Sequence, residues 1–110
     1  MLKRIDKRIY IQYTRGEHLE IFDFYWSNRI ITKIICKHNI RPEEVEELFR
    51  NKNLILRKGK LNQAFGVTNN GRYLIVIFIN RINGIEIVTA RQMTKTERRY
   101  FRNVKKITRL

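Results

Sequence analysis

The sequence predicts an α+β protein in which two helices precede an antiparallel meander of strands and a C-terminal helix. Between residues 27 and 50, apolar residues recur with the spacing of one helix face. From residue 54 to residue 91, apolar runs rich in β-branched residues alternate with turns that contain Asn and Gly, as in antiparallel strands. A Thr-x-x-Glu capping box then opens a helix at Thr94. At 110 residues, the chain has the length of one domain.

The first two helices are bounded by residues with clear conformational preferences. Ser27 can cap the first helix, and Asn39 can end it, because asparagine tolerates the left-handed backbone of a C-terminal cap. Pro42 suits the first turn of the second helix, PEEVEELFR, whose acidic residues lie near its positive end. The predicted buried face of the first helix consists of Ile30, Ile31, Ile34, Ile35 and His38.

The strands of the predicted meander are LILRKG, LNQAFGVT, RYLIVIFI and IEIVTAR. The third is apolar on both faces, which is expected of a central strand covered on both sides. Two alternating patches, at residues 5–13 and 19–25, predict two further strands separated by a turn at Arg15 and Gly16. Residues 1–20 are therefore expected to form an N-terminal extension of the same domain.

The helix that begins at Thr94 is predicted to be amphipathic. Glu97 can accept a hydrogen bond from the N–H group of Thr94. The residues predicted to face inward are Phe101, Val104 and Ile107, and those on the outer side are Arg98, Arg102, Lys105 and Arg109. The outer stripe of this helix is basic.

Arg91 ends the last predicted strand. Regular alternation from Ile85 through Ile87 places Arg91 on the same face as both isoleucines. A charged side chain on that face needs either an anionic ligand or a carboxylate partner such as Glu97.

Net charge restricts the class of partner. The chain has 24 Lys and Arg residues against 10 Asp and Glu, a formal net charge of +14. This excess favours nucleic acid, an anionic membrane surface or an acidic protein, and a role in solubility alone is the alternative. No apolar run approaches the ~18 residues of a membrane span, and MLKRIDKRIY lacks the hydrophobic region of a signal peptide. We expect a cytoplasmic protein.

Cysteine and histidine are scarce, with one and two residues respectively. Cys36 can form no internal disulfide, and its place in a helical run predicts a reduced core residue, with a reactive thiol as the alternative. We expect no metal site and no cofactor.

Four segments resemble, in the same order, those of the BrnT-type toxins of bacterial and archaeal toxin-antitoxin pairs. The segments are WSNRIITKIICKHNI, PEEVEELF, FGVTNNGRYLIVIF and IEIVTARQMTKTERRY. Trp26 stands eleven residues before Lys37, which matches the family spacing. Gly71 and Arg72 precede the central strand as the family's G-R pair does, and Thr89 replaces a family serine. The resemblance covers residues 26–100.

The resemblance implies a RelE-like fold, metal-independent RNA cleavage that arrests translation, and a cognate ribbon-helix-helix antitoxin. The ribosome is a further candidate partner. Three positions depart from the family pattern: Ser27 stands for an aspartate, Asn39 for a glycine, and Phe101 for a frequent glutamate.

Metal-independent RNA cleavage needs a base for the attacking 2'-hydroxyl, an acid for the leaving oxygen, and cations beside the phosphorane. Arg72 and Arg91 can clamp the phosphate, because a planar guanidinium matches two phosphoryl oxygens. His38, at the C-terminal end of a helix, is a candidate acid or base, or else a hydrogen-bonded core histidine. Glu97 and Tyr100 lie three residues apart on the last helix and are therefore neighbours.

Several of these residues have simpler explanations. Glu97 can serve only as the capping-box residue, and Tyr100 can either stack on a base or belong to the core. Lys37 contacts phosphate or is a solvated lysine. The candidate nucleic-acid contacts are Lys37, Arg57, Lys58, Arg98 and Arg102. The acidic block EEVEE is expected to be a solvated face turned away from RNA, with a catalytic carboxylate pair as the alternative.

The leading hypothesis is therefore an endoribonuclease toxin. A non-catalytic nucleic-acid-binding module is the alternative, since the charge alone supports it equally well. Action of the basic C-terminal helix at a membrane surface is a third reading, which the need to cover a sheet with the apolar side of that helix disfavours.

Overall fold

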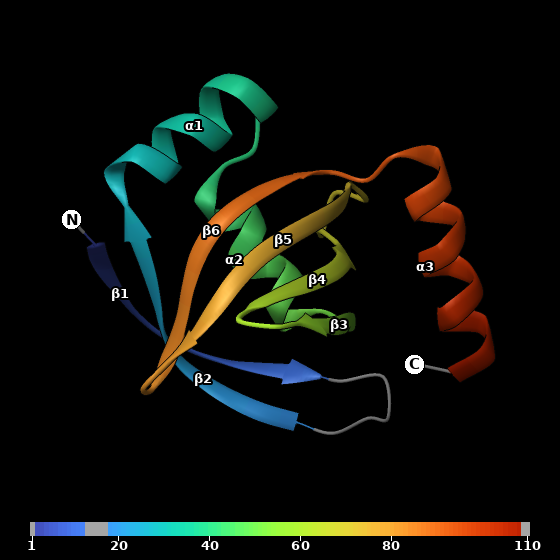
Figure 1. Ribbon diagram of the computed structural model, residues 1–110, viewed down its shortest axis with the longest axis horizontal. Coiled ribbons are helices and arrows are strands. Elements are labelled where there is room, and N and C mark those ends of the chain that lie inside the picture. The colour runs from blue at the N-terminus through green and yellow to red at the C-terminus, as the bar shows by residue number, and fades with distance from the viewer. Residues whose placement is uncertain (1, 13–17, 109–110) are drawn as a thin grey trace.

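The computed structural model describes the backbone of residues 2–12 and 18–108, and the side chains of residues 23–57 and 59–104 (Figure 1). The elements in chain order are β1 (Leu2–Gln12), β2 (His18–Ser27), α1 (Asn28–His38), α2 (Pro42–Arg50), β3 (Asn53–Lys58), β4 (Leu61–Val67), β5 (Tyr73–Arg81), β6 (Gly84–Gln92) and α3 (Lys95–Thr108). The predicted α+β class is confirmed. The predicted turn at Arg15 and Gly16 lies outside the described residues.

The strands form one six-stranded sheet in the order β1-β2-β6-β5-β4-β3. β3 to β6 make the predicted antiparallel meander, with β5 as a central strand, and β1 pairs antiparallel with β2. The sequence did not predict the junction between these two parts. Residues 23–25 of β2 pair in parallel with residues 84–86 of β6, so the sheet is mixed.

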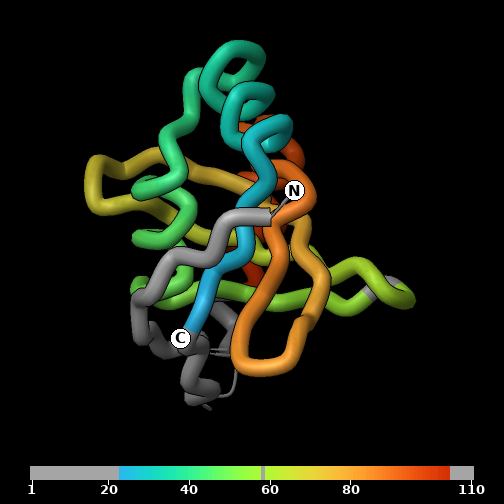
Figure 2. Tube along the Cα trace, turned by 90° about the vertical axis from the view of Figure 1, so that its left-hand side faces the viewer, coloured from blue at the N-terminus to red at the C-terminus, as the bar shows by residue number. Residues whose placement is uncertain are grey.

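The sheet curves around α2, and α1 lies beside β6 (Figure 1). α3 stands apart from both at the opposite end of the molecule (Figure 1). Figure 2 shows the β3–β4 hairpin extending away from α2. None of the helices in the described part of the chain is long and apolar enough to cross a membrane.

The corner between α1 and α2 forms as the sequence predicts. The Ser27 hydroxyl oxygen accepts a hydrogen bond from the N–H group of Ile30 at 3.1 Å, so Ser27 caps α1. Asn39 adopts the left-handed conformation, with φ 53° and ψ 43°, and ends the helix. Pro42 is the first residue of α2. The chain therefore turns sharply between two short helices.

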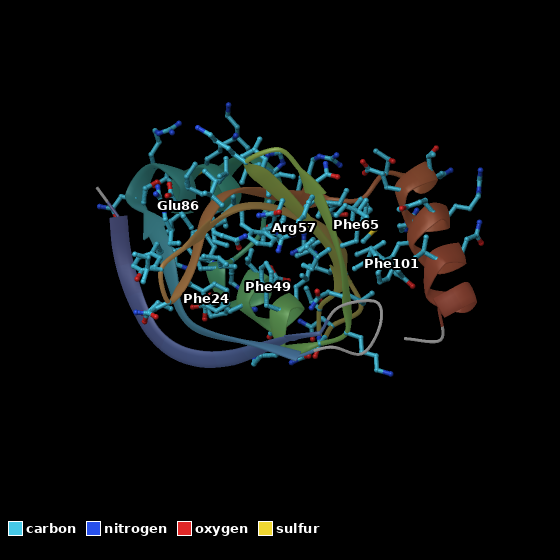
Figure 3. The ribbon with its side chains drawn as sticks, turned by 60° about the horizontal axis from the view of Figure 1, so that its bottom comes forward. Phe24, Phe49, Arg57, Phe65, Glu86 and Phe101 are labelled. Carbon is cyan, nitrogen blue, oxygen red and sulfur yellow. The ribbon has the colours of Figure 1, made fainter. Side chains whose placement is uncertain are left out.

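The larger core lies between the sheet and helices α1 and α2. The ring of Phe49 lies 5.7 Å from that of Phe24 and 5.3 Å from that of Phe78, between ring centroids. Figure 3 shows Phe24 and Phe49 together near α2. The largest fully buried side chains of this core are Trp26, Phe24, Phe49, Ile34, Ile40, Leu48, Leu74, Ile85 and Ile87.

The buried face of α1 is narrower than predicted. Ile30 and Ile34 are buried one turn apart, whereas Ile35 is exposed. The prediction that Cys36 is a core residue is wrong, because Cys36 follows Ile35 on the exposed side. A helix whose core contact is one seam of residues at i and i+4 leaves positions i+5 and i+6 in solvent.

The prediction that the acidic block of α2 is a solvated face is wrong for two of its four glutamates. Glu44 and Glu46 are buried. An oxygen of Glu46 accepts a hydrogen bond from the indole N–H of Trp26 at 3.3 Å. Glu44 accepts one from the N–H of Arg41 at 3.0 Å, which completes the cap of α2. Carboxylates are buried where hydrogen-bond donors satisfy them, as they are here.

A β-bulge in β6 changes the face on which the end of this strand presents its side chains. Ile77 of β5 pairs with Thr89, but the next residue, Phe78, pairs with Ile87. Val88 is therefore an extra residue with none opposite it. Such an insertion reverses the alternation of side chains beyond it.

The bulge separates Arg91 from the isoleucines that precede it. Ile85 and Ile87 belong to the core beneath α1 and α2. Arg91 pairs with Ile75, which belongs to a second cluster on the other face of the sheet. The prediction that Arg91 shares the face of Ile85 and Ile87 is wrong, because strict alternation does not hold across an inserted residue.

The second cluster joins α3 to the sheet. Phe101 of α3 is buried and Val104 is half-buried against it, as predicted, while the side chain of Ile107 lies outside the described residues. Figure 3 shows Phe65 and Phe101 between the sheet and α3. The buried members of this cluster are Leu54, Phe65, Ile75, Met93 and Phe101. α3 thus covers one end of the sheet face that Arg91 occupies.

Candidate functional site

The junction between β6 and α3 is fixed by backbone hydrogen bonds and a capping box. The N–H of Met93 donates to the carbonyl of Tyr73 at 2.9 Å, which extends the pairing of β5 and β6 by one residue. The N–H of Thr94 donates to Glu97 Oε1 at 2.9 Å, and the N–H of Glu97 donates to Thr94 Oγ1 at 3.1 Å. The predicted capping box is therefore confirmed, and it places Glu97 in the first turn of α3.

Arg91 and Glu97 form a two-pronged ion pair across this junction. Nη1 of Arg91 donates to Glu97 Oε1, and Nη2 donates to Oε2, both at 2.8 Å. Nη1 also donates to the carbonyl of Gln92 at 3.1 Å. The Arg91 side chain is 42% exposed and that of Glu97 is 27% exposed. The carboxylate partner considered for Arg91 is therefore present, but the pair lies at the surface.

The pair shifts the protonation equilibria of both groups. The hydrogen bond from Arg91 is the largest cause that lowers the pKa of Glu97 from 4.5 to about 2; partial burial opposes it, and bonds from Thr94 add to it. The hydrogen bond to Glu97 likewise raises the pKa of Arg91. A carboxylate held this strongly in its charged form is a weak proton acceptor while the pair lasts.

Arg72 is held at a different place. Its Nη1 donates to the carbonyl of Asn39 at 2.8 Å, and to the two carboxylate oxygens of Glu44 at 2.9 and 3.0 Å. The Arg72 side chain is 25% exposed and that of Glu44 is only 5% exposed. Arg72 therefore joins the start of β5 to the corner between α1 and α2, whereas Arg91 joins β6 to α3. In the free protein, different carboxylates hold the two predicted clamps.

His38 and Lys37 lie at the end of α1. His38 is the last residue of the helix and is half-buried, which is intermediate between the predicted core residue and an exposed acid or base. The next residue, Asn39, is the one whose carbonyl binds Arg72, so His38 lies at the α1–α2 corner with Arg72. Lys37 is exposed.

The aromatic and basic residues of α3 lie beside the Arg91–Glu97 pair. Tyr100 is 43% exposed, and its ring centroid lies 5.9 Å from that of Phe65 on β4. One side of Tyr100 therefore packs on the sheet while the rest faces solvent. The guanidinium carbon of Arg102 lies 5.2 Å from the ring centroid of Tyr73, a cation–π contact. The sequence analysis did not single out Tyr73, which shares with Ile75 and Ile77 the face of β5 that packs against α3.

The other predicted RNA contacts are dispersed. Arg57 is exposed on β3 and Arg98 is half-buried on α3. The side chain of Lys58, at the end of β3, lies outside the described residues. Arg57 pairs with Asn62, which pairs with Phe78 of the larger core, so Arg57 lies on the face of the sheet opposite to Arg91.

The Arg91–Glu97 pair lies at the surface, as the exposure of both side chains shows. One hollow, of about 640 Å³, lies at the β5–β6 hairpin beside Tyr25. A second, of about 600 Å³, lies between the start of α1 and the bulged part of β6. None of the predicted catalytic residues lines either hollow. An ion pair that is this accessible to solvent can be reached by a phosphate of a long polymer.

Comparison with known proteins identifies the family. A search of curated proteins finds no match. The family model described as "Ribonuclease toxin, BrnT, of type II toxin-antitoxin system" matches residues 26–97, about two thirds of the chain. The match runs from the last residues of β2 to Glu97, and includes His38, Arg72 and Arg91. It leaves out β1, most of β2 and most of α3. With two helices, a meander and the β6–α3 junction all inside the matched residues, the chain belongs to the BrnT family of ribonuclease toxins of type II toxin-antitoxin systems.

Proposed function

We propose that this endoribonuclease toxin cleaves RNA by attack of a 2'-hydroxyl on the adjacent phosphodiester, with Arg91 holding the phosphate. The observation that carries the proposal is the two-pronged bond between Arg91 and Glu97 at the surface. A carboxylate and a phosphodiester both offer two anionic oxygens to the fork of a guanidinium. The Arg91 guanidinium already binds a carboxylate through both prongs, so its orientation also suits a phosphodiester.

The residues around Arg91 supply further parts of the reaction in this proposal. Arg91 stabilises the charge that develops on the phosphorane, which is the stage at which a preorganised donor contributes most to the rate. Glu97, once free of Arg91, accepts the proton of the 2'-hydroxyl. Tyr100 presents an exposed ring on which a neighbouring base can stack.

The α1–α2 corner gives the proposal a second contact region. Asn39, whose carbonyl binds Arg72, follows His38 at this corner, and His38 is the candidate that returns a proton to the leaving oxygen of the phosphodiester. Because the buried Glu44 carboxylate and the Asn39 carbonyl both hold Arg72, we assign Arg72 mainly to positioning this corner. The proposed phosphate contacts along the RNA are Lys37, Arg57, Lys58, Arg98 and Arg102.

Three further parts of the proposal rest on family membership and charge. Cleavage of cellular RNA in the cytoplasm would arrest translation, either on free RNA or at the ribosome. The cognate antitoxin is proposed to be a ribbon-helix-helix protein that covers Arg91 and the proposed phosphate contacts and so stops cleavage. The net charge of +14 supports strong, salt-sensitive association with RNA.

The decisive experiment analyses the products and requirements of cleavage. Purified protein is incubated with RNA in the presence of a chelator, and we expect fragments that end in a 2',3'-cyclic phosphate. A substrate with a single 2'-deoxy nucleotide at the cut should be resistant, because the attacking oxygen is missing. Cleavage of the deoxy substrate, or a strict need for added divalent metal, would reject this mechanism. Tight RNA binding with no cleavage under any condition would favour a binding module.

A further inference from the structure

Two arginine–glutamate pairs lie near the proposed RNA-binding region, and they differ in accessibility. Glu44 is buried, and Arg72 makes a third bond to a backbone carbonyl, so this pair is built into the corner of the helices. Glu97 and Arg91 are both accessible to solvent, although they bond through two prongs. Only the second pair can open without uncovering the core.

We propose that RNA phosphate and the Glu97 carboxylate exchange on the Arg91 guanidinium: Glu97 occupies the fork in the free protein, and a phosphodiester displaces it on binding. The inference rests on the proposed function, because it concerns the same arginine. Glu97 is in this respect an internal competitor of the substrate, as well as a residue that positions Arg91.

The local structure allows this exchange at small cost. When the Glu97 carboxylate turns away, the Thr94 hydroxyl continues to accept the N–H of Glu97, and the exposed N–H of Thr94, which donated to Glu97 Oε1, is left to water. The bond from Arg91 Nη1 to the carbonyl of Gln92 keeps one side of the guanidinium in place. A solvent-exposed ion pair contributes little free energy, so an incoming phosphate can replace it.

The exchange also gives the free protein and the complex different proton acceptors. While Arg91 holds Glu97, the pKa of that carboxyl stays near 2. A phosphate that takes the place of Glu97 removes the main cause of the lowered pKa and adds a negative charge nearby. Glu97 becomes a better proton acceptor at the moment when RNA occupies the site.

The test uses Glu97→Gln with Glu86→Gln as its matched control. Glutamine at position 97 removes the charge but is accepted at this position of a capping box, so the start of α3 is retained. Glu86 also forms a partly exposed ion pair, with Arg81. The side chain of Glu86 is 20% exposed and that of Arg81 is 50% exposed. Figure 3 places Glu86 at the end of the molecule away from α3. Each variant removes one negative charge, so the control measures the general gain in attraction for RNA.

Affinity is measured at fixed salt with an oligonucleotide that carries 2'-O-methyl groups and therefore cannot be cleaved by 2'-hydroxyl attack. Glu97→Gln should bind this RNA about fivefold tighter than Glu86→Gln does, which corresponds to removal of one exposed competing pair. In an Arg91→Ala background the same substitution should give no gain beyond that of the control, since the coupling is specific to Arg91. Equal affinities of Glu97→Gln and Glu86→Gln, or a gain that persists without Arg91, would overturn the exchange.

A kinetic measurement separates competition from a purely structural role. With cleavable RNA, Glu97→Gln should lower both KM and kcat, because the competitor and the proton acceptor are lost together. An unfolded or loosened α3 would raise KM, and that result would overturn the inference.

If wild-type protein cleaves and Arg91→Ala does not, but Glu97→Gln gains no affinity, the exchange fails while the proposed function stands. If Glu97→Gln gains the expected affinity but wild-type protein never cleaves, the exchange stands while the ribonuclease mechanism fails.

Discussion

Arg91 and Ile87 lie on opposite faces of β6, although an even number of positions separates them. Val88, which has no residue opposite it on β5, reverses the alternation between them. Ile87 therefore packs beneath α1 and α2, while Arg91 lies on the face that carries α3 and meets Glu97. The bulge is what brings a strand residue and a helix residue into one ion pair.

The first prediction concerns the contribution of Arg91 to the rate of cleavage. Arg91→Ala should lower RNA cleavage by roughly two to three orders of magnitude, the effect of removing one preorganised transition-state donor. The free energy of unfolding should fall by only about 1 kcal/mol, because the pair is exposed. Arg91→Lys should restore little activity, since lysine keeps the charge and loses the fork. Cleavage rates and urea unfolding curves measure the two effects.

Arg81→Ala is the matched control, because Arg81 also belongs to a half-exposed pair with a glutamate. It should cost a similar amount of stability and leave cleavage unchanged. Equal losses of cleavage in Arg81→Ala and Arg91→Ala would show that Arg91 has no special role.

The second prediction is that Arg72 contributes more to the stability of the fold than Arg91 does. Arg72→Ala leaves the Glu44 carboxylate buried without its main partner, which should lower the free energy of unfolding by about 3 kcal/mol. Replacing Glu44 with Gln in the same protein should recover part of that loss, because an uncharged amide is cheaper to bury unpaired. Urea unfolding of the three variants tests this. A loss no greater than that of Arg91→Ala would contradict the assignment.

Much of the fold was predictable because its signals are local. The caps at Ser27, Asn39 and Thr94, and the proline at the start of α2, each depend on residues within one turn of the chain. The antiparallel meander was predictable for the same reason, since each pair of strands is joined by a short turn. These features do not depend on how the rest of the molecule packs.

The errors in the sequence analysis share a cause, which is contact between distant segments. Nothing near Val88 marks it as an inserted residue, because the bulge appears only in its pairing with β5. Glu44 looked like a solvated residue because its partner, Arg72, lies 28 positions away. Cys36 lies on a helix face that a wider core would have buried. Glu97 could be named from the sequence as a carboxylate partner of Arg91, because it lies only six positions away, but the partner of Arg72 could not.

The third prediction tests the junction between β2 and β6, which the sequence did not reveal. A Cβ atom at Gly84 would lie 2.2 Å from the carbonyl oxygen of Asp23, closer than two such atoms can approach. Gly84→Ala should therefore force the two strands apart and lower the free energy of unfolding by about 3 kcal/mol.

Gly71→Ala is a useful comparison for Gly84→Ala. Gly71 has a φ of 84° and open space around it, so its substitution costs only backbone strain of about 1 kcal/mol. Urea unfolding compares the two variants. A Gly84→Ala protein as stable as wild type would mean that β2 does not pair closely with β6.

The last prediction concerns the pH dependence of the Arg91–Glu97 pair. The folded protein lowers the pKa of Glu97 from 4.5 to about 2, so the folded state binds fewer protons than the unfolded state in this range. The stabilisation by the pair is therefore complete above pH 4.5 and is lost as the pH falls towards 2. Because the pair is exposed, the stability difference between wild type and Glu97→Gln should be about 1 kcal/mol at pH 7. It should stay constant down to about pH 5 and shrink below that value. Urea unfolding of both proteins at a series of pH values measures this difference.

In an Arg91→Ala background the dependence should be much weaker, since the hydrogen bond from Arg91 is the largest cause of the lowered pKa of Glu97. A difference that stays constant from pH 7 to pH 2, or one equally pH-dependent without Arg91, would show that this pair does not hold Glu97 in its charged form.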